Sequence, residues 1–272
     1  MNKFTVSTAV VLLALASQAA VAAPDWGKVP KRDINVFHAG VTPIEWATKK
    51  SDHSGSAGMR KGESCAGCHE EKGTLNFNFK RLADKELEPK GAPKTMMFPV
   101  SVQAAYDAAN LYIRLTFKAP SGGADKGDKD NEVKATVLFA DAKVPQADQY
   151  GCWQSCHADA RTMPGADDKK TKDATEGAYE LMQWASKGNK VSDGSVTTER
   201  KMTGGTTGAK AEASKSGDTY TVTFTRKNPG EGKAVPFGIA VHADNSSGRF
   251  HHVSLGYKLG IGADGDVKAA KQ

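Results

Sequence analysis

The sequence lacks the marks of several large protein classes. No catalytic triad, phosphate-binding loop or second metal motif is recognisable, and no internal repeat of solenoid length occurs. Basic side chains (37 Lys and Arg) are interspersed with acidic ones (31 Asp and Glu), and no stripe of basic and aromatic residues is present, so nucleic-acid binding is not expected. The net charge of +6 indicates a solvated surface, with docking to an acidic partner as the weaker alternative.

Long apolar runs are also missing. The longest is Ala9–Ala16, which follows Lys3 and precedes the small residues Ala20-Val21-Ala22. This order is typical of a secretory signal peptide, and we place its cleavage after Ala22. The apolar run is too short to span a bilayer, and no later segment is long enough. We therefore expect an exported, soluble mature protein, with the bacterial periplasm as its compartment.

Cysteine is scarce, with four residues in the chain, and the first two form a motif with a histidine. Cys65 and Cys68 are separated by two residues, and His69 follows directly. This is the attachment pattern of c-type haem, in which two thiols reach neighbouring vinyl groups and the histidine binds the iron. A bare pair of cysteines would equally suit a zinc half-site, a redox disulfide or a buried pair. The adjoining histidine and the export signal favour haem.

The other two cysteines repeat the pattern. Cys152 and Cys156 are separated by three residues, a rarer spacing for haem attachment, and His157 follows. A four-cysteine zinc site would also use two close pairs, but it would need neither histidine. Two haem c groups use every thiol in the chain. We therefore predict two covalent haems, with His69 and His157 as the proximal iron ligands.

The distal ligands determine whether each iron transfers electrons or binds small molecules. A sixth protein ligand leaves no coordination position open on the iron. For the first haem we favour His53, in a Gly/Ser turn 16 residues before His69. His38, Met59 and an open iron site remain alternatives.

For the second haem, an extended strand over 249–261 would place His251 on one face with Val253, Leu255, Tyr257, Leu259 and Ile261. If this face is the interior, His251 reaches the iron. A buried histidine bonded to backbone is the structural alternative, and His252, His242 and Met163 are the other possible ligands.

The chain divides into a signal peptide (1–22), a loop-rich and partly helical haem c module (23–95), a mainly β haem-binding domain (96–262) and a C-terminal tail (263–272). A charged loop at 121–131 is expected to be mobile and solvated. A capping pattern at Asp173 and Glu176, with Ala178, Leu181, Met182 and Ala185 on one face, predicts a helix that ends at Gly188. Alternating apolar residues predict strands at Leu111–Phe117, Val133–Phe139, Lys210–Ser214, Tyr220–Thr225, Val235–Val241 and Arg249–Tyr257. Many antiparallel strands with little helix predict a β-sandwich.

Two segments resemble one family of exported cytochromes: 151–164, around the second cysteine pair, and 236–254. Residues 95–262 are similar to the haem-binding subunit of ethylbenzene dehydrogenase and related dimethyl sulfoxide reductase-type enzymes. The resemblance implies a β-sandwich that holds one haem after a separate haem c module, with electron transfer as its function. That subunit binds its haem without covalent attachment and uses methionine and lysine as axial ligands. This chain has thiols and His157 instead, so those ligands cannot be carried over.

We therefore expect an electron-transfer protein and not an enzyme, with both irons six-coordinate. Its partners would be other redox proteins, or it would be the haem subunit of a larger exported complex. The competing prediction is a haem enzyme or gas sensor with one five-coordinate iron. A zinc-binding or thiol–disulfide protein is the third.

Overall fold

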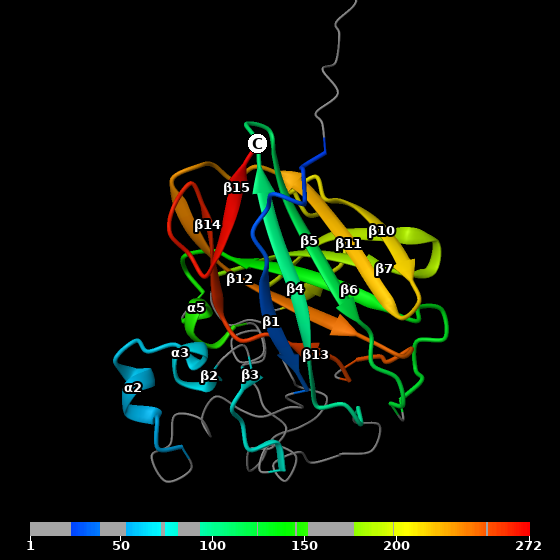
Figure 1. Ribbon diagram of the computed structural model, residues 1–272, viewed down its shortest axis with the longest axis horizontal. Helices are drawn as coiled ribbons and strands as arrows, with labels where there is room; N and C mark the ends of the chain where they lie inside the picture. Colours follow the sequence, from blue (N-terminus) through cyan, green and yellow to red (C-terminus); the bar gives the residue numbers. More distant parts are fainter. Residues whose placement is uncertain are drawn as a thin grey trace, which may run out of the picture.

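The computed structural model describes residues 23–38, 53–71, 74–80, 93–123, 125–144, 146–151, 177–197, 199–248 and 250–272. The predicted mainly β fold with minor α structure is confirmed, since strands dominate and the helices are short (Figure 1). The proposed signal peptide and the second cysteine motif, Cys152–His157, lie outside the described residues.

The strands form one large sheet with two halves. The first half has the order β10 (Lys210–Ser216), β11 (Thr219–Lys227), β5 (Asn110–Lys118) and β4 (Met97–Tyr106). The second half has the order β12 (Lys233–His242), β6 (Lys134–Ala140), β7 (Tyr179–Ala185), β8 (Lys190–Val196) and β9 (Arg200–Lys201). The halves face each other across the main core, where the rings of Trp184 and Tyr220 lie 6.1 Å apart. The sheet is therefore sandwich-like.

Four short strands join the two halves between β4 and β12. β1 (Arg32–Phe37) pairs with β4 and with β13 (His252–Val253), which in turn pairs with β12. Further along the same edges, β15 (Val267–Lys271) pairs with β4 and with β14 (Tyr257–Ile261), which also pairs with β12. The join is thus built from the two ends of the described chain.

Alternation of apolar and polar residues explains why several strands could be predicted correctly from the sequence. In β11, Tyr220, Val222 and Phe224 are buried while the threonines between them are only half-buried. Side chains of successive strand residues point to opposite faces, so this pattern covers the core on one side only. The predicted strands at 111–117, 133–139, 210–214, 220–225 and 235–241 correspond to β5, β6, β10, β11 and β12.

The helix predicted up to Gly188 is wrong over 179–185, where β7 pairs with β6 and β8. Both faces of β7 are buried. Met182 and Trp184 belong to the main core, while Tyr179 and Leu181 belong to a second apolar cluster on the other face. A strand that is buried on both faces carries apolar residues at odd and even positions, which imitates helical spacing. Residues 173–176 lie outside the described part of the chain.

Two strands of the large sheet lie outside 96–262, the range predicted for the haem-binding domain. β1 belongs to the large sheet, although it falls within 23–95, and β15 belongs to it, although it falls within 263–272. Neither segment shows a strong alternating pattern of its own, and each is a strand because it completes the pairing of its neighbours. The division into a haem c module and a haem-binding domain stays a prediction.

The charged loop at 121–131 is solvated as the sequence predicted, since none of its described residues is buried, and it also makes contacts with the rest of the fold. The Asp244 carboxylate accepts hydrogen bonds from the backbone N–H groups of Gly122 and Gly123 at 2.8 and 3.0 Å. Lys126 forms an ion pair with the same carboxylate, and Asp128 accepts from Asn131. Charges in this loop are therefore used for internal contacts that hold it against the end of β12.

The predicted strand at 249–257 is interrupted by a bulge. Val253 lies opposite Ala240 of β12, but Tyr257 lies opposite Phe237. The chain advances four residues from Val253 to Tyr257 but only three from Ala240 to Phe237 on the partner strand. The first segment therefore contains one extra residue, which is a β-bulge. As a result His252, which lies opposite Val241, shares a face with Tyr257, and His251 does not. The strand-parity argument for His251 is therefore wrong.

Two short helical elements follow the strands β6 and β7. α5 (Ala147–Tyr150) precedes Gly151, and a 3₁₀ turn (Lys187–Asn189) connects β7 to β8. Among the described residues, no helix has the length and apolar character needed to cross a bilayer.

Candidate haem site

The first cysteine motif forms a helix of its own, α3 (Cys65–His69). Ser64 begins it, because the Ser64 hydroxyl accepts a hydrogen bond from the Gly67 N–H at 2.9 Å. Residues three apart on a helix lie on one side, so α3 presents the Cys65 and Cys68 thiols together. Neither thiol takes part in a disulfide bond within the described part of the chain. The short helix therefore offers two sulfur atoms on one side and a histidine at its end.

The chemistry of Cys65 suits a thioether better than a reactive thiol. Burial, and then the neighbouring Cys68 thiol, raise the pKa of Cys65 to about 12. Redox and nucleophilic cysteines need the opposite shift, because the thiolate is the reactive form. A neutral thioether loses nothing by burial, and Cys65 packs against the main core. The thiol–disulfide alternative is therefore disfavoured by this environment.

His69 is oriented by the hairpin that follows it. β2 (Glu70–Glu71) pairs with β3 (Thr74–Leu75), and the Asn76 N–H then donates to the His69 carbonyl at 2.7 Å. In return, the His69 Nδ1 lies 2.8 Å from the Asn76 carbonyl. A carbonyl can only accept, so Nδ1 carries the proton and Nε2 is the nitrogen that can bind a metal. Histidines that bind metal ions are commonly oriented by such a bond.

The His53 ring lies beside the His69 ring at a spacing that suits two histidine ligands of one metal atom. The two rings lie with their centroids 5.9 Å apart and their planes 26° from parallel. Imidazole–metal bonds are about 2 Å long, which places two imidazoles on opposite sides of one metal with ring centres about 6 Å apart. This pair and the two thiols fit a haem c group.

Gly55 makes room for the His53 ring. His53 lies in the turn before α2 (Ser56–Arg60), where the Ser56 N–H donates to the His53 carbonyl at 3.1 Å. A Cβ atom on residue 55 would lie 2.9 Å from His53 Cε1 and 3.3 Å from His53 Nε2. Contacts this short require the ring to move.

We therefore expect Gly55→Ala to weaken a bond between His53 and the first haem iron. The low-spin electron paramagnetic resonance signal of that haem should lose intensity, with a high-spin signal in its place. Gly123→Ala is a matched control, because a Cβ there would have its nearest neighbour at an ordinary 3.8 Å. An unchanged low-spin signal in Gly55→Ala would argue against His53 as a ligand.

The haem motif docks on the sheet through β1. The Arg32 guanidinium donates to the Glu70 carboxylate at 2.8 Å. The rings of Phe37 and Phe77 lie 5.0 Å apart, and the Phe77 ring lies 4.7 Å from that of His69. A continuous row of rings thus connects the sheet core to His69.

Four other histidines gather where β1, β12 and β13 end, and their hydrogen bonds divide them into two kinds. His38 and His251 use Nδ1, which lies 3.2 Å from the His251 carbonyl and 3.1 Å from the Gly248 carbonyl, respectively. His242 uses Nε2 instead, at 3.0 Å from the Gly248 carbonyl. His38 and His251 therefore share the pattern of His69, and His242 does not.

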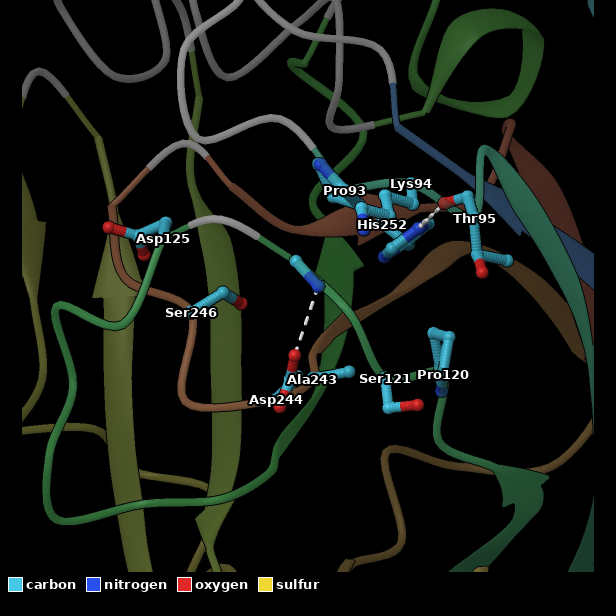
Figure 2. Close-up of a pocket in the computed structure, with 11 residues that line it drawn as sticks. Pro93, Lys94, Thr95, Pro120, Ser121, Asp125, Ala243, Asp244, Ser246 and His252 are labelled. Atoms are coloured by element: carbon cyan, nitrogen blue, oxygen red, sulfur yellow. Dashed lines mark hydrogen bonds between the residues drawn. The ribbon is translucent and has the colours of Figure 1, made fainter.

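His252, like His242, forms its hydrogen bond through Nε2. Its Nε2 lies 2.7 Å from the Thr95 carbonyl, at a small pocket lined also by Pro93, Pro120 and Asp244 (Figure 2). The side chain is 2% exposed. Burial, which outweighs the Thr95 bond, lowers the pKa of His252 to about 4. Because Nε2 is bonded to Thr95, His252 would have to bind iron through Nδ1 or give up that bond, and this alternative is weakened.

The structure thus brings His53 together with Cys65, Cys68 and His69, and it groups His38 with His251 and His252. Met59 is buried at 5% exposure. Cys152, Cys156, His157 and Met163 lie outside the described residues. Asn76 and Phe77, which orient His69, were not singled out by the sequence. No sequence signal marks Asn76, because the group it supplies is a backbone carbonyl.

Comparisons with known proteins show the family of this chain. A family model described as ethylbenzene dehydrogenase matches residues 23–234. Cytochrome c-551 of Rhodocyclus tenuis is 49% identical over 254 residues, which cover 92% of this chain and 100% of that protein. Cytochrome c-552 of Stutzerimonas stutzeri is 46% identical over 292 residues, which cover 100% of both chains.

Similarity to solved structures is low. Two structures of a family 9 carbohydrate-binding module from Caldicellulosiruptor kristjanssonii, with glucose and with cellotriose, are 12% identical to this chain, with TM-scores of 0.32 and 0.31. They cover 57% and 58% of this chain and 65% and 64% of their own, and likeness this weak supports no functional argument. The family match and the two cytochromes are decisive: the chain belongs to the ethylbenzene dehydrogenase family and is a c-type cytochrome of that family.

Proposed function

We propose that this cytochrome holds two covalent haem c groups and carries electrons between other redox proteins in the bacterial periplasm. Haem c supplies an iron atom that takes up and releases one electron when it is bound. The relatives named cytochrome c-551 and c-552 support electron transfer as the function. The family match also allows a role as the haem subunit of a larger complex.

The residues of the first site have separate roles in this proposal. Cys65 and Cys68 form the two thioethers, and His69 binds the iron through Nε2 while Asn76 holds its orientation. His53 binds from the other side. The observation that carries the proposal is the pair of imidazole rings with centroids 5.9 Å apart and planes 26° from parallel, because two histidine ligands would leave no position on the iron for external molecules. A closed iron exchanges electrons and does not bind substrate.

For the second site, the proposal rests on the sequence motif, with Cys152 and Cys156 as thioethers and His157 as the proximal ligand. We keep His251 as the distal ligand. The strand-parity argument for it has failed, but its Nδ1 bond to the Gly248 carbonyl is the pattern that His69 shows. His252 and His38 stay as alternatives, with His252 the less suitable.

Two measurements on the native protein test the proposal. Mass spectrometry should give the polypeptide mass after cleavage at residue 22 plus two haem groups, and a bare polypeptide or a single haem would contradict it. The optical spectrum of the reduced protein should not change on addition of carbon monoxide, because both irons are closed. Rapid carbon monoxide binding at either haem would instead favour the haem enzyme or gas sensor.

A further inference from the structure

An ion pair connects the large sheet to the residue that directly follows His69. The Arg32 guanidinium of β1 donates a hydrogen bond to the Glu70 carboxylate, with 2.8 Å between Nη2 and Oε2. The Glu70 side chain is 10% exposed and the Arg32 side chain is 39% exposed. The Glu70 charge is therefore largely removed from water, and its partner is a side chain of the sheet.

Arg32 is held beside Glu70 by the sheet and by an aromatic ring. In the register of β1 and β4, Arg32 lies opposite Val102. Its guanidinium carbon lies over the Tyr257 ring, 5.6 Å from the ring centre, which is within the range of a cation–π contact. Because strand pairing fixes β1, the position of the guanidinium beside Glu70 is a property of the fold.

Tyr257 contributes no charge to this cluster. It is 1% exposed, and burial, followed by the charge of Glu70, raises the pKa of its hydroxyl above the usual value. The hydroxyl therefore stays protonated and neutral at neutral pH. The charges of the cluster are thus one carboxylate and one guanidinium.

These two charges lie close to the proposed iron site. Glu70 follows His69 in the chain, and the Cα atoms of neighbouring residues are about 3.8 Å apart. An oxidised haem iron carries one more positive charge than a reduced one, so a nearby carboxylate favours the oxidised state and a guanidinium favours the reduced state. Partly buried charges act over such distances with less screening than charges in water. The pair can therefore shift the equilibrium between the two iron states.

We propose that Arg32 and Glu70 set the midpoint potential of the first haem, with the guanidinium offsetting the effect of the carboxylate. This inference rests on the proposed attachment of haem c at Cys65 and Cys68, with His69 as an iron ligand. The donor protein supplies one electron, which reduces ferric iron to ferrous iron, and the step needs no proton transfer and no change in covalent bonds. Arg32 and Glu70 act through their charges and do not bind the iron.

Redox titration of the holoprotein, followed by optical absorbance, tests this proposal. Arg32→Gln leaves the Glu70 carboxylate without its partner, so the midpoint potential of the first haem should fall. Glu70→Gln leaves the Arg32 charge without its partner, so the potential should rise. Each shift should correspond to at least a threefold change in the equilibrium constant for reduction, or about 28 mV for one electron. The double variant should return close to the native potential.

The component of the first haem is identified in the variant Cys152→Ala with Cys156→Ala, which should keep that haem alone. Two further variants are controls. Arg32→Lys keeps the positive charge, so its potential should stay close to that of the native protein. Glu71→Gln removes a carboxylate from the next residue, but Glu71 is exposed and screened by water, so its shift should be smaller than that of Glu70→Gln.

Opposite signs separate an effect of charge from an effect of packing. Shifts of the same sign in Arg32→Gln and Glu70→Gln, or no shift in either, would overturn the proposal. Equal shifts in Glu70→Gln and Glu71→Gln would overturn the role of the buried pair. In all these outcomes the haem is still attached. A native protein without haem by mass, or no loss of haem from Cys65→Ala with Cys68→Ala, would instead reject the proposed function at this site.

Discussion

Replacing Cys65 and Cys68 together with alanine is expected to remove one of the two haem groups from the protein. α3 presents both thiols on one side, and without thioethers only the histidine bonds would remain to hold the haem. Mass spectrometry of the purified variant should show the loss of one haem mass, and the haem absorbance per polypeptide should fall accordingly. The Asn76 and Ser64 contacts of α3 do not involve the thiols, so the hairpin should persist.

The complementary variant, Cys152→Ala with Cys156→Ala, is the matched control for this experiment. It should lose one haem as well, but the remaining haem should be the one that faces His53. Gly55→Ala would then still alter its spectrum, whereas it would not alter the spectrum of the first variant. Retention of both haems in the Cys65/Cys68 variant would contradict attachment at α3.

Phe37→Ala is expected to cost about 3–5 kcal/mol of the free energy of unfolding, the usual range for truncating a buried phenylalanine. Phe37 is fully buried at the end of β1, and its ring packs on Phe77, which packs on His69. The loss should therefore appear twice: as a lower midpoint in chemical denaturation, and as a change in the spectrum of the first haem under native conditions.

Phe224→Ala separates these two effects. Phe224 in β11 is also fully buried in the main core, but no ring contact connects it to the described part of the haem site. It should be destabilised to a similar extent, with an unchanged haem spectrum. If Phe37→Ala also left the haem spectrum unchanged, the row of rings from the core to His69 would have no influence on the iron.

The parts of the site that the sequence predicted are those defined by local spacing. Cys65, Cys68 and His69 form one helical turn, so their relation follows from the chain itself. His53 was a weaker inference, yet the structure places its ring opposite His69, because the turn before α2 returns the chain and Gly55 leaves space for the ring. Whether His53 binds iron stays a prediction, as does the full set of second-site ligands.

The parts that the sequence did not reveal depend on partners far along the chain. β7 is buried on both faces, and this is evident only once β6, β8 and the second apolar cluster are in place. The bulge between Val253 and Tyr257 is defined by register against β12, and one inserted residue reversed the face assigned to His251. The Gln149 amide donates hydrogen bonds to the Met59 and Glu63 carbonyls, which precede it by 90 and 86 residues, so no local sequence pattern predicts these hydrogen bonds.

The position of β15 has a consequence for the order in which the molecule matures. Residues 267–271 are the last strand of the sheet in sequence, and they lie between β14, which directly precedes them in the chain, and β4, which comes much earlier. A chain that emerges from its N-terminus can therefore pair β4 with β5 early, whereas the connection of β4 to β14 through β15 forms only when the last residues have emerged. The cysteines of α3 precede β15 by roughly two hundred residues, so during the proposed export they would reach the periplasm, and be open to haem attachment, before β15 is in place.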